Sequence, residues 1–211
     1  DIVTLHVPLN REGRDQTLAM ADRDFLQAMK TGAWLINSSR GEVVEDEALA
    51  EALGANRLGG AVLDVFNHEP TPDRRLLERA AITTPHIAGY STDGKANGTM
   101  MSVQAVSRFF GLGLDDWQPE GLPGPEVNIL HLDGAATAWT GEVKTVYDPT
   151  YDVMVDHRAL QDAPKKFEAL RGGYRVRREP PAYAVRLYND DGLYRQILEG
   201  LGFSVLGDFC L

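Results

Sequence analysis

Short apolar runs that stop at polar residues recur three times in the first half of the chain. The runs cover residues 34–36, 61–66 and 81–84, and the residues after their apolar positions include Arg40, Glu69 and His86. Runs of this length are typical of strands buried in a parallel sheet. Because the carboxyl ends of parallel strands meet at one edge, where ligands bind, we expect these three side chains to share one pocket.

Segments with helical spacing lie between these runs. Residues 21–30 repeat apolar side chains every three to four positions, and Asp22 is placed to cap the amino end of a helix. Residues 45–53 show the same spacing, and residues 2–7 form a further strand-like run that Pro8 closes. Strands that alternate with helices in this way predict βαβ units, and therefore an α/β fold with a parallel sheet.

The second half of the sequence does not repeat this pattern of alternating strands and helices. Residues 92–110 lack proline and predict one long helix, whereas residues 115–125 hold three prolines and two glycines and predict a boundary. Beyond it we expect strands at 128–132, 182–187 and 203–206 and helices at 135–147, 164–172 and 192–201. The predicted organisation is therefore an incomplete parallel-sheet domain with a returning helix (1–113), a linker (114–127) and a small α+β domain (128–211).

Composition narrows the possible partners. The 211 residues carry a formal charge of −10, which argues against nucleic acid or an anionic membrane as a partner. No apolar run approaches the roughly 18 residues of a membrane span. The one cysteine, Cys210, excludes a disulfide within the chain and favours a reducing, cytoplasmic location. The chain opens without Met on a strand-like run, so we expect a fragment of a longer protein.

The three strand-end residues suit one kind of chemistry. The planar guanidinium of Arg40 can hold a carboxylate or a phosphate at two points. Glu69 precedes Pro70, which restrains its backbone, and it can accept a hydrogen bond from a histidine ring. His86 can then act as a general acid or base at an alcohol or carbonyl oxygen. Taken singly, each has a plainer explanation: a solvated turn arginine, an exposed loop acid and a structural histidine.

Neighbouring polar residues leave several alternatives open. Asp64 either anchors a polar ligand group or caps a turn, and Ser38 and Ser39 offer hydroxyl and N–H groups suited to phosphate or ribose. A serine nucleophile is weakly supported because no Gly-x-Ser-x-Gly elbow is present. A metal site is weakly supported as well, because the five histidines show no metal-ligand spacing, and we expect none.

The order and spacing of these motifs resemble those of the D-isomer-specific 2-hydroxyacid dehydrogenases. The resemblance rests on residues 35–44, on Leu63-Asp64-Val65 with Glu69-Pro70, and on residues 84–88, and it covers roughly residues 1–110. Residues 86–99, 167–171, Tyr174 and 177–179 are similar to the members of that family that act on a phosphorylated 2-hydroxy acid. The resemblance implies a Rossmann-like NAD-binding domain followed by a C-terminal α+β dimerisation domain, and therefore a homodimer.

The same resemblance implies a role for each site residue. Arg40 would hold the substrate carboxylate, His86 would accept the alcohol proton, and Glu69 would orient His86 and stabilise its charge. The residues that would line the NAD site are Ser38, Ser39, Arg40, Asp64 and Gly89, and Tyr90 would line the substrate site. The reaction would be hydride transfer from the alcohol carbon to NAD.

Two departures from the family pattern set limits on this interpretation. The chain contains no Gly-x-Gly-x-x-Gly segment and no acidic residue following one to bind the ribose. We therefore expect these 211 residues alone to bind NAD poorly and to turn over little. The alternatives are a related dehydrogenase acting on glycerate or phosphoglycerate, and a non-catalytic oligomerisation module that keeps the fold.

Overall fold

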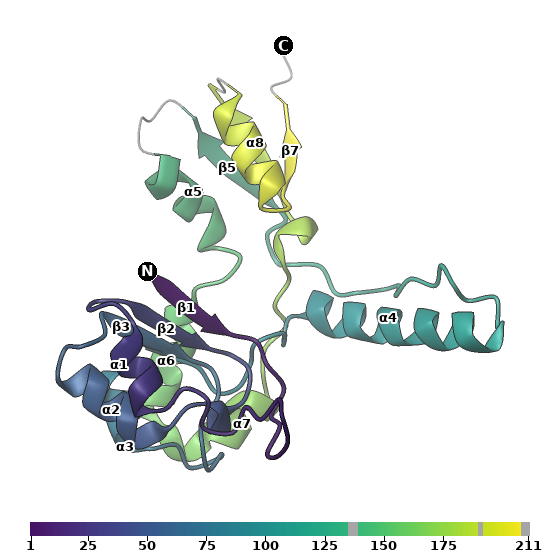
Figure 1. Ribbon diagram of the computed structural model, residues 1–211. Coiled ribbons are helices and arrows are strands. Elements are labelled where there is room, and N and C mark those ends of the chain that lie inside the picture. The colour runs from purple at the N-terminus through teal and green to yellow at the C-terminus, as the bar shows by residue number, and fades with distance from the viewer. Residues whose placement is uncertain (135–138, 190–191, 208–211) are drawn as a thin grey trace. The chain divides into compact units, whose positions relative to one another are not determined.

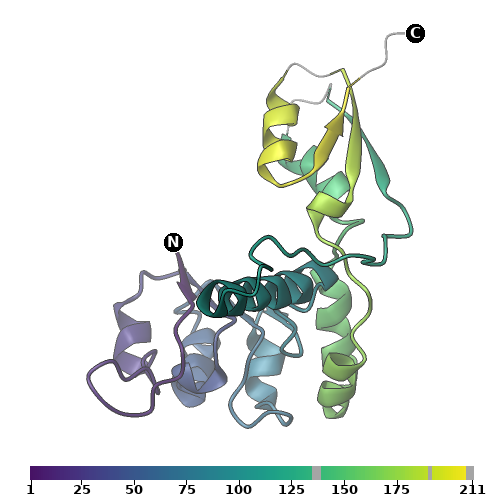
Figure 2. The same cartoon turned by 90° about the vertical axis from the view of Figure 1, so that its right-hand side faces the viewer.

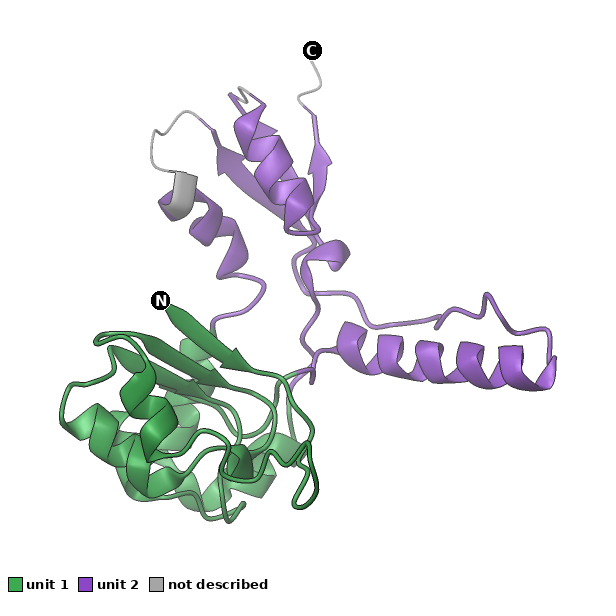
Figure 3. Cartoon of the chain, in the orientation of Figure 1, with its two compact units in different colours: residues 1–88, 153–174 green, residues 89–152, 175–211 purple. Residues whose placement is uncertain are grey.

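The computed structural model describes residues 1–134, 139–189 and 192–207. The chain forms two compact units (Figure 3). The first unit contains residues 1–88 and 153–174, and the second contains residues 89–152 and 175–211.

The first unit is built on a four-stranded parallel sheet (Figure 1). Its strands, in spatial order, are β1 (Ile2–Leu5), β2 (Trp34–Asn37), β3 (Gly60–Leu63) and β4 (Ile82–Thr83). Their register aligns Leu5 with Asn37, Asn37 with Leu63, and Leu63 with Thr83. The carboxyl ends of all four strands therefore reach the same edge, which confirms the arrangement predicted from the sequence.

Three helices connect the strands of this sheet. They are α1 (Arg23–Ala28), α2 (Asp46–Gly54) and α3 (Arg74–Arg79), and α2 packs between the other two. Asp22 caps α1 as expected, with its carboxylate accepting a hydrogen bond from the backbone N–H of Phe25 at 2.9 Å. Helix α3 was not predicted, because four of its six residues are charged and only Leu76 and Leu77 are buried.

The domain boundaries differ from the organisation predicted from the sequence. Helices α6 (Val153–Asp162) and α7 (Phe167–Gly172), joined by a 3-10 turn (Pro164–Lys166), belong to the first unit. The physical reason is burial, because Leu160 and Phe167 are fully enclosed in the core of the first unit. Phe167 also packs edge-on against Phe66, with 6.1 Å between the ring centroids. The structure thus groups the chain into two units, each formed by two separate stretches, whereas the sequence predicted a single division at residues 114–127.

The second unit contains a three-stranded parallel sheet. Its strands are β5 (Ile129–Asp133), β6 (Ala184–Tyr188) and β7 (Ser204–Leu206), with β6 in the middle. Helices α5 (Trp139–Tyr147) and α8 (Leu193–Gly200) pack against it, and Figure 2 shows α8 beside β7 in yellow. A 3-10 turn (Pro180–Ala182) precedes β6. A small α+β domain was expected here, and the structure adds that its three strands run parallel.

Two sequence-based interpretations fall outside the described residues. The first four residues of the helix predicted for 135–147 lie outside the described residues, and so does Cys210. Within the described part of the chain, no helix combines the length and the hydropathy needed to span a membrane.

The long helix α4 (Thr92–Phe110) has the bounds predicted from the sequence and belongs to the second unit. Ser107 is its one buried residue, and Gly111 ends it in the left-handed conformation at φ +66°. Several of its apolar side chains are exposed, among them Met101, Phe109 and Phe110.

Candidate active site

Asn37 shapes the turn that follows β2. Its side chain is fully buried, and its Oδ1 accepts hydrogen bonds from the backbone N–H (3.1 Å) and the hydroxyl (2.8 Å) of Ser39. Its Nδ2 donates to the carbonyl of Arg40 at 2.9 Å. An asparagine that satisfies the backbone two and three residues ahead fixes a tight turn. Arg40 therefore extends its exposed side chain from a rigid base.

Gly41 continues this turn because a side chain would not fit there. A Cβ atom at position 41 would lie 2.0 Å from the carbonyl carbon of Phe66 and 2.4 Å from the backbone nitrogen of Asn67. The 3-10 turn Gly41–Val43 thereby lies directly against the loop that carries Glu69. This contact holds two of the three strand-end loops together.

Replacing Gly41 by alanine should destabilise the first unit by about 1–3 kcal/mol, because the backbone of Phe66 would have to move. Gly98→Ala is the matched control, since Gly98 lies inside α4 with open space around its Cα and a negative φ. That change should stabilise the protein by up to about 1 kcal/mol. Urea titration of both variants measures the difference, and equal stability of the two would contradict the close contact.

Glu69 is held at both of its carboxylate oxygens. Oε1 accepts a hydrogen bond from the backbone N–H of Phe66 at 3.0 Å, and Oε2 lies 2.7 Å from Nδ1 of His86. Both side chains are about one-fifth exposed, so the pair is largely shielded but can be reached from solvent. The contact leaves Nε2 as the ring nitrogen of His86 that can meet a ligand.

Asp64 anchors the turn that presents His86. Its Oδ1 accepts from the hydroxyl of Thr84 (2.6 Å) and the backbone N–H of Ile87 (2.8 Å), and its Oδ2 accepts from the N–H of Ala88 (2.9 Å). Asp64 is itself buried. His86 sits between these anchored residues at φ +56°, a left-handed conformation that is strained for a residue other than glycine. The structure thus shows the turn-capping role that the sequence left open for Asp64.

The strand-end loops enclose a cavity of about 300 Å³ in the first unit. The residues that line it are Arg40, Gly41, Glu42, Phe66, His68, Glu69 and His86. The structure therefore brings together the three side chains that the sequence singled out. An imidazole with a fixed carboxylate partner, beside a guanidinium, can bind a hydroxy acid and exchange a proton with its hydroxyl.

His68 is a lining residue that the sequence analysis did not identify as part of the site. It is exposed and adopts φ +60°, next to Asn67, whose Nδ2 donates to the carbonyl of Val44 (3.1 Å) and to Asp46 (2.7 Å). Burial raises the pKa of Asp46 above its ordinary value, although the Asn67 hydrogen bond and the His68 charge act in the opposite direction. A titratable carboxyl group therefore lies close behind the loop that carries His68 and Glu69.

The other predicted site residues, Ser38, Ser39, Gly89 and Tyr90, do not line this cavity. Ser39 is buried and bonded to Asn37, and its carbonyl accepts a hydrogen bond from Arg40 at 2.6 Å. Ser38 is partly exposed beside it. Gly89 and Tyr90 belong to the second unit, where Nζ of Lys95 lies 4.2 Å from the centre of the Tyr90 ring. Their proposed contacts with cofactor and substrate stay predictions.

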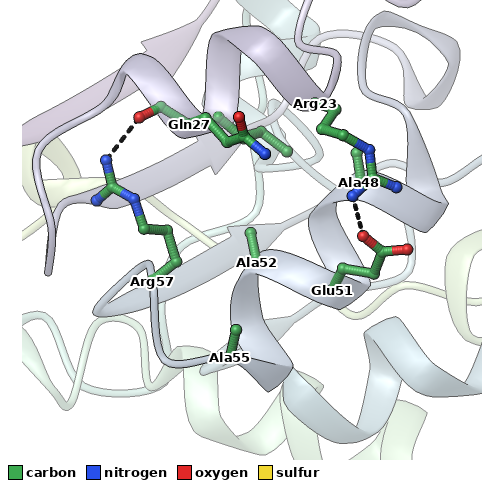
Figure 4. A pocket seen from close by; sticks show the side chains of 8 residues that line it. Arg23, Gln27, Ala48, Glu51, Ala52, Ala55 and Arg57 are labelled. Atoms are coloured by element: carbon green, nitrogen blue, oxygen red, sulfur yellow. Dashed lines mark hydrogen bonds and ion pairs between the residues drawn. The ribbon is translucent and has the colours of Figure 1, made fainter.

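A second groove in the first unit, between α1 and α2, has a structural explanation (Figure 4). Arg23 and Glu51 form an ion pair across it. Arg57 donates to the carbonyl of Gln27 at 2.6 Å. It also donates to the carbonyl of Met29, at the carboxyl end of α1. Because these charged groups already pair within the protein, the groove offers little to a ligand.

Known proteins that match this chain include 2-hydroxyacid dehydrogenases. Residues 1–88 match the family model for the D-isomer specific 2-hydroxyacid dehydrogenase, NAD binding domain. A protein of Bacteroides fragilis named erythronate-4-phosphate dehydrogenase is 46% identical over 185 residues, which are 88% of this chain and 50% of that protein. A protein of the same name from Pseudomonas fluorescens is 39% identical over 209 residues, which are 96% of this chain and 55% of that protein.

Solved structures also match part of this chain. The D-lactate dehydrogenase of Aquifex aeolicus, complexed with NAD and lactic acid, is 31% identical with a TM-score of 0.44, covering 56% of this chain and 39% of that one. The chain spans about half the length of the curated relatives that it matches.

Proposed function

We propose that the protein oxidises a D-2-hydroxy acid with NAD, because residues 1–88 match the family model for the NAD-binding domain of the D-isomer-specific 2-hydroxyacid dehydrogenases. The proposed substrate is erythronate 4-phosphate, the compound named for relatives that are 39–46% identical to this chain. The product would be the corresponding 2-oxo acid, formed as a step of pyridoxal phosphate biosynthesis.

The observation that carries this proposal is the 2.7 Å contact between Glu69 Oε2 and His86 Nδ1 in the cavity that Arg40 also lines. A carboxylate at this position favours the tautomer with a proton on Nδ1 and leaves Nε2 free to act as a base. The substrate hydroxyl would lose its proton to Nε2 while the C–O bond becomes a carbonyl. Glu69 would stabilise the imidazolium that forms.

Arg40 would orient the substrate in this reaction. One of its N–H groups donates to the carbonyl of Ser39 at 2.6 Å, and the rest of the fork remains for an anion. A guanidinium on a fixed base can hold the carboxylate at two points, which aligns the hydroxyl next to it with His86. Glu42, paired with Arg11 at 3.1 Å, lines the same cavity and would disfavour a second anionic group on its side.

The first unit would supply part of an NAD site. When bound, NAD supplies the hydride acceptor, and none of the side chains that line the cavity can take that role. Ser38, Ser39 and Arg40, which follow β2 in the first unit, would hold it. Asp64, whose oxygens already accept three hydrogen bonds, would support this site by fixing the 84–88 turn.

Comparing substrates tests the proposed reaction. NADH formation is followed with erythronate 4-phosphate, D-glycerate and 3-phosphoglycerate, using the intact protein that contains these 211 residues. A kcat/KM at least tenfold higher for erythronate 4-phosphate supports the proposed substrate. A preference for glycerate or phosphoglycerate would keep the reaction class and replace the substrate, and no turnover of any of them would favour a non-catalytic role.

Replacing Arg40 by lysine should lower kcat/KM by about 10- to 100-fold, mainly through KM. Lysine keeps the charge but cannot form the two-point contact, and the expected loss corresponds to about one charged hydrogen bond. Arg14→Lys is the control, because Arg14 is an exposed loop residue. Initial rates over a range of substrate concentrations separate the two constants, and an unchanged KM in the Arg40 variant would contradict the assigned role.

We also propose that the protein forms a homodimer through its second unit. The exposed apolar side chains of α4 support this, because Phe109 and Phe110 are 81% and 67% exposed. Large aromatic side chains exposed together are common at protein–protein interfaces. Light scattering of the purified protein measures its mass in solution, and a monomer at micromolar concentration would contradict this proposal.

A further inference from the structure

The second unit contains a cavity of its own, of about 660 Å³. It lies where residues 124–127, 149–150 and 175–178 meet Leu130 and Tyr183. Its volume is within the range of small-molecule sites. Three of its lining residues are arginines, Arg175, Arg177 and Arg178, although the protein as a whole carries a formal charge of −10. Arginine side chains are thus concentrated in the wall of this cavity.

Arg177 has a buried N–H group that is available to a ligand. Its Nε is buried and has no hydrogen-bond partner among the described residues. Its guanidinium lies 4.2 Å from the centre of the Tyr151 ring, a cation–π contact that helps to hold the guanidinium in place. Buried N–H groups without a partner are rare in native proteins, and a bound ligand is one of the usual reasons for them.

Arg178 has a different role in the same cavity wall. Its Nε and Nη2 donate to the two carboxylate oxygens of Asp93, both at 2.9 Å, and its Nη1 donates to the carbonyl of Pro123 at 2.6 Å. The charge of Arg178 is therefore balanced within the protein. In the described part of the chain, no carboxylate forms an ion pair with Arg177. Glu126 also lines the cavity, and its side chain is exposed.

The other lining groups indicate what kind of anion fits. Leu130 and Tyr183 are buried and give the cavity an apolar wall, which suits an organic body rather than a bare ion. The hydroxyl of Tyr183 makes no hydrogen bond to the described residues and can donate to an oxyanion. The exposed carboxylate of Glu126 favours a ligand that offers a hydroxyl group on that side.

We propose that this cavity binds a small hydroxylated phosphate monoester, with the phosphoryl group on Arg177 and the Tyr183 hydroxyl. A phosphoryl group has the oxygen spacing that a guanidinium edge matches at two points. The site is formed by residues of the second unit and shares no lining residue with the cavity that contains Arg40, Glu69 and His86. It does not depend on the proposed enzymatic function.

Calorimetric titration of the 211-residue chain tests the site with three probes: inorganic phosphate, glycerol 3-phosphate and D-glycerate. We expect glycerol 3-phosphate to bind, and Arg177→Gln to weaken its affinity at least tenfold. Arg177→Lys, which keeps the charge and the stem, should give an intermediate loss. In parallel, the side-chain Nε–H signal of Arg177, followed by NMR with labelled arginine, should shift on titration.

Two control variants separate this site from other anion contacts. Arg108→Gln removes the same charge from an exposed position on α4, and Arg40→Gln removes the anion-binding group of the candidate active site. Both should bind glycerol 3-phosphate as the unchanged protein does. Loss of binding in Arg40→Gln with retention in Arg177→Gln would overturn the proposal and leave the proposed function standing. Binding of D-glycerate with equal affinity, lost in Arg177→Gln and kept in Arg40→Gln, would overturn the assignment to phosphate esters. Binding of inorganic phosphate without glycerol 3-phosphate would overturn the organic ligand.

Discussion

Replacing His86 by glutamine is expected to lower kcat for oxidation of the 2-hydroxy acid by roughly 10²- to 10⁴-fold, the usual contribution of a general base. Glutamine has a similar length and can donate to Glu69, but it cannot take up the proton of the substrate hydroxyl. The rate is measured on the intact protein with saturating substrate and NAD. KM should change much less than kcat, because Arg40 remains in the cavity.

The matched control for this variant is His6→Gln. His6 is exposed, and its Nε2 lies 2.8 Å from the hydroxyl of Thr4, so the same chemical change there should leave kcat within about twofold. Glu69→Gln provides a second test, because it removes the carboxylate beside Nδ1 while an amide oxygen can still accept from Phe66. It should lower kcat less than the His86 variant does. Turnover by His86→Gln within threefold of normal would exclude the assigned role.

The sequence predicted the parts of the fold that local patterns determine. The strands of the first sheet, the Asp22 cap and the bounds of α4 all follow from apolar spacing, capping chemistry and a glycine stop. The meeting of Arg40, Glu69 and His86 followed from one topological rule about parallel strand ends. These features need no knowledge of contacts between distant segments.

The features that the sequence did not reveal depend on such distant contacts. Two contacts hold α6 in the first unit. His157 Nδ1 accepts a hydrogen bond from the backbone N–H of Thr83 at 3.1 Å, across 74 positions of sequence, and Leu160 is buried in the core. The turn made by Asn37 had a local signal, an asparagine at the end of an apolar run. The placement of His68 in the cavity had none, because it depends on a left-handed backbone at a histidine.

Of three ion pairs in the described part of the second unit, Lys144–Asp148, Arg195–Glu199 and Asp93–Arg178, the last should contribute most to stability. The Asp93 and Arg178 side chains are only 15% and 13% exposed, and the contact is bidentate at 2.9 Å. Asp93 also accepts the backbone N–H of Glu179 at 2.8 Å, which ties the start of α4 to the segment before β6. Breaking one side of a buried pair typically costs about 3–5 kcal/mol.

Asp93→Asn is therefore expected to lower the free energy of unfolding of this unit by about 3 kcal/mol at neutral pH. Urea titration, with hydrogen exchange of the β5–β7 amides as the local readout, measures the loss. Glu78→Gln is the control, since its ion pair with Arg74 is exposed on both sides and should contribute less than about 1 kcal/mol. Equal losses in the two variants would contradict the assigned importance of the Asp93 pair.

The pH dependence of stability provides an independent check on the same pair. Burial acts to raise the pKa of Asp93, but the hydrogen bonds from Arg178 and Glu179 and the Arg178 charge outweigh it, so that the pKa lies below its ordinary value. A carboxyl group with a lowered pKa in the folded state stabilises the protein above its unfolded pKa of about 4. This contribution is lost as the pH falls from there through the lowered value. Asp93→Asn should therefore lose less stability than the unchanged protein on acidification below about pH 4, and parallel curves for the two would show that Asp93 is not the group that titrates.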